Sequence, residues 1–412
     1  MTHSAKHPTK LVMMVAVAVG LSIMGDSLMY GILPLEAENL GFTLSGVGLL
    51  LSANRLIRLL SNTWAGAVFE RFGPRLPFIA ATGLGFVAAL VYGAGWGFVA
   101  FLLARIGWGI AWSGLRQGGY EAVWRGEAQI KGRLMGLLFG IVRLGSAISV
   151  VLGGYLRDHY GYQVSISLIA GLTALAIPVA LTVRWPPMTL NGVPSNTVNA
   201  SDTSLNLLWA GWRQALRYPV RRWLLTAGFI NALMEGVVIA TASIFLAERL
   251  GQAANLPVFI GVGTIAGTLL AIRWTANMLF GPLIGALSDR LGQAQTIVAL
   301  AGTMFGALVG AIILSGIWLI LSLLVAFISL AGLFITLTAA SSGVATQARR
   351  PHLFVGVYTT AADGGAAIGP LLAFNLGQLT GFEALYLGIG LLLLLTVIRY
   401  WQVEQRDVAR DP

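Results

Sequence analysis

The sequence predicts an all-α membrane protein with twelve transmembrane helices arranged as two pseudo-symmetric six-helix bundles. Three observations predict this fold class: an apolar composition, twelve apolar stretches of membrane-spanning length, and short patterns that recur about 220 residues later. Hydrophobic residues make up 57% of the 412 residues, and charged residues make up 10%. Soluble domains carry about 25% charged residues, so this composition is typical of a polytopic membrane protein.

The apolar stretches place the helices in chain order. The hydrocarbon core of a bilayer is about 30 Å thick and needs roughly 20 apolar residues per helix. We place the spans at 11–33, 44–66, 76–95, 98–119, 133–155, 162–184, 222–246, 258–284, 296–315, 317–340, 353–375 and 382–402. The apolar run that begins the chain continues to Leu33 without a cleavage site, so it is interpreted as the first span and not as a signal peptide.

Two loops carry the clearest repeated pattern, Gly-x-x-x-acid-Arg-x-Gly. It follows the second span and recurs after the eighth span, 219 residues later. The residues that we expect to act in gating are Gly66, Glu70, Arg71 and Gly73 in the first copy, and Gly285, Asp289, Arg290 and Gly292 in the second.

Glycines of the fifth span recur in the eleventh at an offset of 220. Gly136, Gly145, Gly153-Gly154 and Gly161 correspond to Gly356, Gly365, Ala373-Phe374 and Gly381. A helix face without side chains lets a neighbouring backbone come close. We interpret the matched glycines as an interface between two halves that move.

The repeats define the domain organisation. We expect an N-terminal six-helix bundle at 1–185, a cytoplasmic linker at 186–221 and a C-terminal six-helix bundle at 222–412. The linker begins with Pro186-Pro187, which ends the sixth helix, and it is otherwise polar and basic.

Basic residues orient the spans. With a cytoplasmic N-terminus, eighteen of the 26 Lys and Arg residues fall in cytoplasmic loops and tails, as the positive-inside rule requires. Both termini are therefore expected in the cytoplasm, and the expected location is a bacterial plasma (inner) membrane. The net charge of +10 is dispersed over many short loops that face anionic lipid, a distribution that argues against nucleic-acid binding.

The chain has no cysteine and therefore no disulfide or thiolate site.

These residues give the chain a resemblance to a known family. The doubled loop pattern resembles the signature of the major facilitator superfamily, and the span count, half repeat and central linker extend the resemblance over the whole chain. Arg105 with Gly109 is similar to the family's span-four arginine motif. The span-five glycines are similar to its antiporter motif, in which Ser149-Val150 stands where Gly-Pro is usual.

The resemblance implies a geometry. Spans one, four, seven and ten would line a central cavity, while span two packs against span eleven and span five against span eight. Glu70 would lie at the start of span eleven, and Asp289 at the start of span five, each held by the positive end of a helix. Both contacts would close the cytoplasmic side.

Charged residues inside the spans carry the functional argument. Each costs about 2.5–3.5 kcal/mol at the centre of a membrane helix, so such residues face a partner or a water-filled path. Five arginines stand against three carboxylates, and this surplus predicts a cavity for an anionic group. The residues predicted to line the substrate and proton pathway are Asp26, Tyr30, Arg55, Arg58, Arg105, Trp108, Trp112, Arg143, Asn231, Glu235, Arg273, Asn277 and Asp363.

Family geometry also suggests which charges pair. Asp363 could pair with Arg55 or Arg58, and Glu235 with Arg273. We then expect Asp26, Arg105 and Arg143 to be more available. Burial favours the neutral form of a carboxylate, whereas a neighbouring arginine favours the ionised form, and Asp26 and Glu235 are the expected proton sites.

The sequence thus predicts a secondary active transporter that moves a small anionic or amphipathic solute by alternating access, coupled to protons as a symporter or antiporter. The alternatives are a proton-independent anion uniporter or exchanger, and a non-transporting membrane sensor or scaffold. The spans hold no Ser/His pair, metal-ligand spacing or Gly-x-x-x-x-Gly-Lys motif, so no enzyme, metal, cofactor or ATP hydrolysis is expected. The expected partners are a small-molecule substrate, protons and the lipid bilayer, and we expect a monomer. The substrate and the direction of transport stay open.

Overall fold

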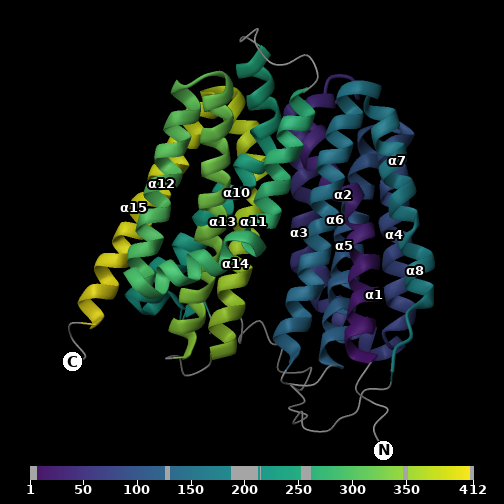
Figure 1. The fold of residues 1–412 in the computed structure, drawn as a ribbon, viewed down its shortest axis with the longest axis horizontal. Coiled ribbons are helices and arrows are strands. Elements are labelled where there is room, and N and C mark those ends of the chain that lie inside the picture. Colours follow the sequence, from purple (N-terminus) through teal and green to yellow (C-terminus); the bar gives the residue numbers. More distant parts are fainter. Residues whose placement is uncertain are drawn as a thin grey trace, which may run out of the picture. The chain divides into compact units, whose positions relative to one another are not determined.

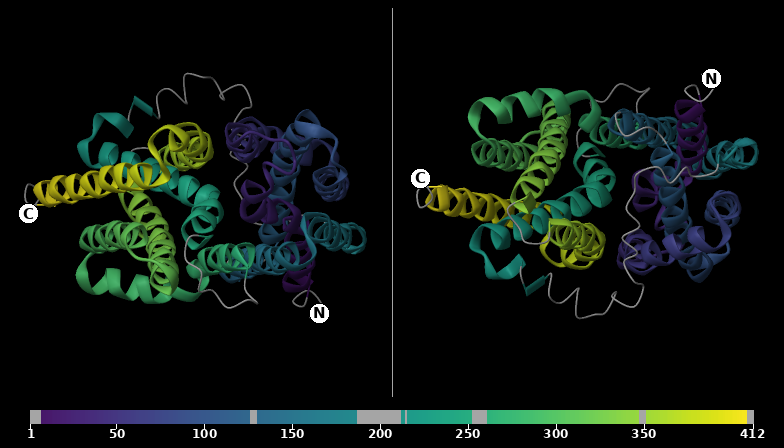
Figure 2. Two further views of the ribbon diagram at one scale, coloured as in Figure 1. Left: turned by 90° about the horizontal axis from the view of Figure 1, so that it is seen from above. Right: turned by 90° about the horizontal axis from the view of Figure 1, so that it is seen from below.

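A computed structural model describes residues 7–125, 130–186, 212–213, 215–251, 261–346 and 351–408. Helices dominate these residues, and no strand occurs among them. Figure 1 shows the helices in chain order, and Figure 2 shows them end-on. The fold is the predicted all-α membrane protein.

The helices divide into two compact units. Unit 1 comprises Met1–Thr189 and Ile239–Thr275, and unit 2 comprises Leu190–Val238 and Ala276–Pro412. Two long helices contribute to both units, because α10 runs from Pro219 to Gly251 and α11 from Val262 to Leu291. The domain limits at 185 and 222 remain a prediction.

The first half of the chain supplies most of unit 1. Its helices are α1 (His7–Ser22), α2 (Met24–Ile32), the 3-10 helix η1 (Pro34–Glu36), α3 (Leu44–Phe72), α4 (Arg75–Ala94), α5 (Gly97–Trp124), α6 (Lys131–Tyr160), α7 (Tyr162–Ala174) and α8 (Ala176–Thr182). Helix α5 packs between α3 and α4, while α6 packs along α1 and α2. This packing brings α2, α3 and α5, which carry most of the predicted polar residues, into one bundle.

The second half of the chain supplies the remaining helices of unit 2. They are α12 (Gln293–Ile313), α13 (Gly316–Thr346), α14 (Pro351–Thr380) and α15 (Phe382–Val408). Helix α12 lies between α13 and α15, and α14 contacts both α13 and α15. Figure 1 shows these helices in green to yellow.

Nine helical segments of the described chain are long and apolar enough to cross a membrane. One of them joins α1 with α2, and another joins α7 with α8. The three remaining long helices are α3, α11 and α14, and these carry predicted intramembrane polar residues: Arg55 and Arg58, Arg273 and Asn277, and Asp363. These polar side chains lower the mean hydropathy of α3, α11 and α14, which explains why the three helices are not among the nine.

The repeated loops adopt matching conformations in the two halves. Helix α3 ends at Phe72 and is followed by Gly73 with φ of 70°, while α11 ends at Leu291 and is followed by Gly292 with φ of 91°. Residues with a side chain rarely adopt this left-handed region. The last glycine of each Gly-x-x-x-acid-Arg-x-Gly pattern therefore ends its helix.

The matched glycines also show the repeat in packing. A Cβ atom at Gly145 of α6 would lie 2.2 Å from the carbonyl oxygen of Gly20 in α1, and one at Gly365 of α14 would lie 2.3 Å from that of Phe229 in α10. Gly145 and Gly20 both belong to the first half of the repeat, and Gly365 and Phe229 both belong to the second. The interpretation of Gly145 and Gly365 as an interface between moving halves is therefore wrong, because these glycines let two helices of the same half touch.

The residue that departs from the span-five motif has a structural role of its own. Ser149 donates a hydrogen bond to the carbonyl oxygen of Met24 at 2.5 Å, and Ser27 donates to Ser146 at 3.0 Å. Both bonds are buried and join α6 to α2. They fix the helix that carries Asp26.

Candidate functional site

The interior of unit 1 contains a buried ion pair between α2 and α5. Nη1 of Arg105 lies 2.5 Å from Oδ1 of Asp26. The Arg105 side chain is fully buried, and that of Asp26 is 7% exposed. Removing two charges from water costs several kcal/mol per ion unless further hydrogen bonds satisfy them.

Helix α3 supplies two further hydrogen bonds, while Nη2 of Arg105 is buried with no hydrogen-bond partner among the described residues. Nε of Arg105 donates to the carbonyl oxygen of Leu50 at 2.9 Å, and Nδ2 of Asn54 donates to Oδ1 of Asp26 at 2.8 Å. The two donors to Asp26 thus converge on a single carboxylate oxygen. Among the described residues, no hydrogen bond to Oδ2 is found.

Helix α3 can reach the pair because α3 and α5 approach closely at Gly109. A Cβ atom there would lie 2.5 Å from the carbonyl oxygen of Asn54 and 2.2 Å from the side chain of Ile57. Any larger residue would push α3 away from α5. The Arg105–Gly109 pattern therefore combines a charge with the space that lets this charge reach α3.

An aromatic side chain connects the ion pair to a second arginine. The hydroxyl of Tyr30 donates to Oδ1 of Asn54 at 3.4 Å and accepts from Nε of Arg55 at 3.3 Å. The guanidinium carbons of Arg55 and Arg105 lie 5.7 Å and 5.5 Å from the centre of the Tyr30 ring. Such cation–π contacts stabilise cations that have lost part of their water.

A third arginine lies one turn further along α3. The guanidinium carbon of Arg58 is 5.4 Å from the centre of the Trp112 ring. Asp26, Arg55 and Arg116 lie within electrostatic range of Arg58. Its Nε atom is buried, and no hydrogen-bond partner for it is found in the described part of the chain.

A small cavity lies beside Trp112. It has a volume of about 10 Å³, room for one water molecule. Its lining includes Trp112 and Arg116 of α5 and Val142 of α6. The polar cluster, defined here as Asp26, Tyr30, Asn54, Arg55, Arg58 and Arg105, thus lies close to space lined by an aromatic ring and a further cation.

The structure corrects one sequence-based expectation. We expected Asp26 and Arg105 to be more available than the other charges, and instead they pair with each other. The two residues are 79 positions apart, and helical periodicity within each helix gives no information on how two helices face each other. Arg143, the third residue of that expectation, has an exposed side chain on α6.

The tryptophans of α5 have different environments. Trp108 is 1% exposed, and a Cβ atom at Gly85 of α4 would lie 2.9 Å from its ring. Trp112 is only partly buried and faces the small cavity. The two tryptophans predicted to line the pathway are therefore a core residue, Trp108, and a cavity residue, Trp112.

The other predicted pathway residues lie on α10, α11 and α14. Asn231 and Arg273 are buried, Glu235 and Asn277 are partly buried, and Asp363 is exposed. Oδ1 of Asn231 and Oδ1 of Asn277 are buried, with no hydrogen-bond partner among the described residues. The pairings expected for Asp363 and Glu235 remain predictions.

The predicted gating residues lie at helix ends. Glu70 and Arg71 are exposed at the end of α3, and Arg290 is exposed at the end of α11. The side chain of Asp289 lies outside the described part of the structure. Contacts of Glu70 and Asp289 with other helix starts remain predictions.

Sequence reasoning missed Asn54 and the carbonyl oxygen of Leu50. Asn54 interrupts the apolar second span immediately before Arg55 and is completely buried. A buried amide needs hydrogen-bond partners, so its position was an available signal. The hydrogen bond from Arg105 to the carbonyl oxygen of Leu50 could not be predicted, because every residue has a backbone carbonyl.

The fold and the cluster define a class of protein. It is a polytopic helical membrane protein with a charged cluster buried in the first half of its repeat. A family comparison specifies the class further, because the model of the Major Facilitator Superfamily matches residues 15–277 and 227–412. These matches extend over nearly all of the chain, and the protein belongs to this superfamily.

Solved structures of transporters share the fold at low sequence identity. A bacterial homolog of the human lysosomal transporter Spinster, solved in an inward-facing conformation, is 13% identical with a TM-score of 0.75, covering 98% of both chains. The nucleoside transporter NupG is 14% identical with a TM-score of 0.75, covering 96% of this chain and 98% of its own. A POT family transporter bound to a thioalcohol-conjugated peptide is 16% identical with a TM-score of 0.71, covering 97% and 96%. A comparison with curated proteins finds no match.

Proposed function

We propose that the protein is a secondary active transporter that moves a small organic anion with an apolar part across the membrane, together with a proton, by alternating access. The observation that carries this proposal is the polar cluster, where Asp26 lies among Arg55, Arg58 and Arg105. Membership of the superfamily supports the proposal that the protein is a transporter. The charge and geometry of the cluster support the proposal that it moves an anion together with a proton.

The net positive charge of the cluster favours an anion. Arg105 is paired with Asp26, whereas Arg58 stacks on Trp112. Nη2 of Arg105 and Nε of Arg58 are both buried donors without a hydrogen-bond partner among the described residues. A carboxylate or phosphate could accept hydrogen bonds from Arg58, since a guanidinium suits planar anions. The ring of Trp112 would contact the apolar part of the solute.

Competition for Arg105 supplies the coupling to a proton. An anion that binds Arg105 weakens the hold of Arg105 on Asp26, and a buried carboxylate without a cationic partner favours its protonated form. The hydrogen bonds to Asp26 both reach Oδ1, so Oδ2 is the atom proposed to take the proton. Anion binding and proton binding then assist each other reciprocally, which favours cotransport over exchange.

One observation favours the proton-independent alternative. Asn54 donates to Asp26 and would continue to stabilise its ionised form after Arg105 has been engaged by the anion. In that case the protein would exchange anions without moving protons. Measuring proton uptake during anion transport separates the two candidates.

Topology and gating complete the proposal. We place both termini and the linker 186–221 in the cytoplasm of a bacterial inner membrane, because Lys and Arg gather in the corresponding loops. Residues 1–185 and 222–412 would form two bundles that move around a central site. Glu70 and Asp289 would close the cytoplasmic side at the ends of α3 and α11.

A binding experiment tests the substrate class. The melting temperature of the purified protein would be measured with aromatic and aliphatic carboxylates, organic phosphates, neutral sugars and lipophilic cations. A ligand that binds only the folded state raises stability, and the proposal expects stabilisation by amphipathic anions alone. Stabilisation by cations and not by anions would reject the proposed substrate class.

A further inference from the structure

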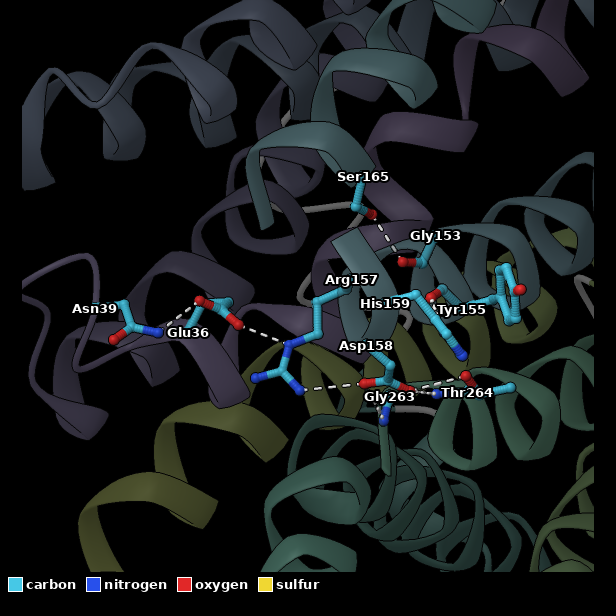
Figure 3. A network of polar contacts seen from close by, with 10 residues as sticks. All are labelled: Glu36, Asn39, Gly153, Tyr155, Arg157, Asp158, His159, Ser165, Gly263 and Thr264. Carbon is cyan, nitrogen blue, oxygen red and sulfur yellow. Dashed lines mark hydrogen bonds and ion pairs between the residues drawn. The ribbon is translucent and has the colours of Figure 1, made fainter. Parts of the chain in front are cut away.

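Another carboxylate with little exposure to solvent lies near the end of α6. The side chain of Asp158 is 6% exposed. Its Oδ1 accepts from the backbone N–H of Gly263 at 3.1 Å, and its Oδ2 accepts from the backbone N–H of Thr264 at 2.7 Å and from the Thr264 hydroxyl at 2.8 Å. Figure 3 shows these contacts, which join α6 to the first turn of α11 within unit 1.

The start of α11 needs such an acceptor. The first N–H groups of a helix have no partner within the helix. The residue before α11 is Gly261, whose carbonyl oxygen accepts from the N–H of Ile265 at 3.1 Å. Gly261 has no side chain that could cap these groups. Asp158 supplies the cap from another helix, and its negative charge lies at the positive end of the α11 dipole.

Glycines make the contact possible. A Cβ atom at Gly261 would lie 2.3 Å from Cγ of Asp158, and one at Gly154 would lie 2.3 Å from the carbonyl oxygen of Gly263. Further along, a Cβ atom at Gly267 would lie 2.1 Å from the carbonyl oxygen of Val150. The two helices therefore touch through their backbones, with few interlocking side chains to oppose separation.

An ion-pair network positions Asp158. Arg157 donates to Oε1 of Glu36 at 2.6 Å and to Oδ1 of Asp158 at 3.2 Å. Oε2 of Glu36 accepts from Asn39 at 2.9 Å (Figure 3). Arg157 thus ties the carboxylate to the segment that follows α2.

The sequence relates this contact to the predicted gating loops. Gly154 to Gly161 follow the pattern Gly-x-x-x-Asp-x-x-Gly, the same acid and glycine spacing as the loops that contain Glu70 and Asp289. This copy lies at the opposite end of the helices, which the charge pattern places outside. At an offset of 220, the residue equivalent to Asp158 is Gln378, which carries no charge.

We propose that Asp158 and the first turn of α11 form a reversible contact, named here the Asp158 cap, which holds the outer ends of α6 and α11 together and breaks when the protein opens outward. The proposal rests on alternating access, because α6 belongs to the first half of the repeat and α11 to the second. Charge-assisted hydrogen bonds that one carboxylate accepts, and not interlocked side chains, hold the two helix ends together. The contact can therefore break as a unit and form again.

The experiment uses the absence of native cysteine. Val150 is 1% exposed, its carbonyl oxygen lies against Gly267 of α11, and it stands one turn before Gly154 on the same face of α6, so Val150→Cys is a reporter of separation between the helices. A membrane-impermeant maleimide is added from the outer side to vesicles containing Val150→Cys alone or with Asp158→Ala. We expect Asp158→Ala to accelerate labelling at least about tenfold, since the capping hydrogen bonds are charge-assisted.

A second measurement addresses the cap itself. Hydrogen exchange at the amides of Gly263 and Thr264 should accelerate by a similar factor in Asp158→Ala and by less in Asp158→Asn, which retains an acceptor oxygen. Thr264→Val is the matched control, because it removes the hydroxyl contact and leaves both backbone donors. It should change exchange much less than Asp158→Ala.

A reporter on the face of α6 toward α2 separates opening from general loosening. Ser149→Cys replaces a completely buried residue whose hydroxyl donates to the carbonyl oxygen of Met24 in α2, and its labelling should be unchanged by Asp158→Ala. Equal acceleration at both reporters, or no acceleration at Val150→Cys, would overturn the proposal. If Asp158→Ala does not fold, the same comparison is made with Asp158→Asn. Labelling and hydrogen exchange are both measured without substrate. The proposed role of the Asp158 cap can therefore be tested even if the protein does not transport anions.

Discussion

Asp26 of α2 receives hydrogen bonds from Arg105 of α5 at 2.5 Å and from Asn54 of α3 at 2.8 Å, both on the same carboxylate oxygen. Three helices therefore meet at one atom in the interior of unit 1. The other carboxylate oxygen is the atom at which protonation would leave these donors in place. This geometry gives the cluster two roles, one in stability and one in coupling.

The stability role predicts a rescue. Arg105→Gln leaves Asp26 buried without its cation, and breaking a buried pair typically costs about 3–5 kcal/mol. Asp26→Asn in the same protein removes the stranded charge and should recover most of the loss in melting temperature. The exposed Arg399→Gln serves as the control and should change stability by about 0.5 kcal/mol or less. A single Arg105→Gln variant as stable as the wild type would contradict the buried pair.

Asn54 should contribute through its hydrogen bonds. Asn54→Leu preserves approximate volume but removes the donor to Asp26 and the acceptor for Tyr30. We expect a destabilisation of about 1–3 kcal/mol, because a buried group loses its partner. Chemical unfolding in detergent measures this change. A neutral effect would show that Asn54 only fills space.

Arg58 should affect binding more than folding. Arg58→Gln keeps a polar side chain and removes the charge that stacks on Trp112. One lost charge-assisted hydrogen bond corresponds to about 1.5–3 kcal/mol, or roughly tenfold to a hundredfold in affinity for the anion. Titration of the best-stabilising anion against both proteins measures this ratio. Unchanged affinity would place the anion elsewhere.

The glycine repeat offers paired controls. Gly145→Ala and Gly365→Ala would each place a Cβ atom against a neighbouring backbone oxygen, at 2.2 Å and 2.3 Å. Gly136→Ala and Gly356→Ala, at another pair of repeated positions, would each place a Cβ atom that meets nothing within 4 Å. The first pair should lower the melting temperature, whereas the second should leave it unchanged or raise it, since alanine favours helices over glycine by about 1 kcal/mol. Equal effects in the two pairs would argue against backbone contact at Gly145 and Gly365.

The sequence was sufficient for the architecture because composition and repeats are properties of the chain alone. Apolar length predicted the spans, and the repeated loops predicted the turns at Gly73 and Gly292, where a positive φ angle requires glycine. Charged and polar residues inside the predicted spans brought Asp26, Tyr30, Arg55, Arg58 and Arg105 into a larger set of candidates. The structure places these five residues in one cluster.

The pairing within the set could not be predicted, because it depends on the rotation and depth of neighbouring helices. Gly109 lets α3 approach α5, and that approach brings the carbonyl oxygen of Leu50 within reach of Arg105. The role of Asp158 was missed for another reason. Its segment lacks the arginine after the acid that defined the predicted gating pattern.

Proton uptake during anion transport tests the central claim most directly. Purified protein in liposomes that contain a pH-sensitive dye would be given an inward gradient of the best-stabilising anion, with membrane potential clamped. We predict that the interior acidifies with anion entry in the wild type, and that Asp26→Asn, in which the carboxylate is replaced by a neutral amide, moves anion without this acidification. Anion entry with no acidification in the wild type, or unchanged acidification in Asp26→Asn, would contradict the account.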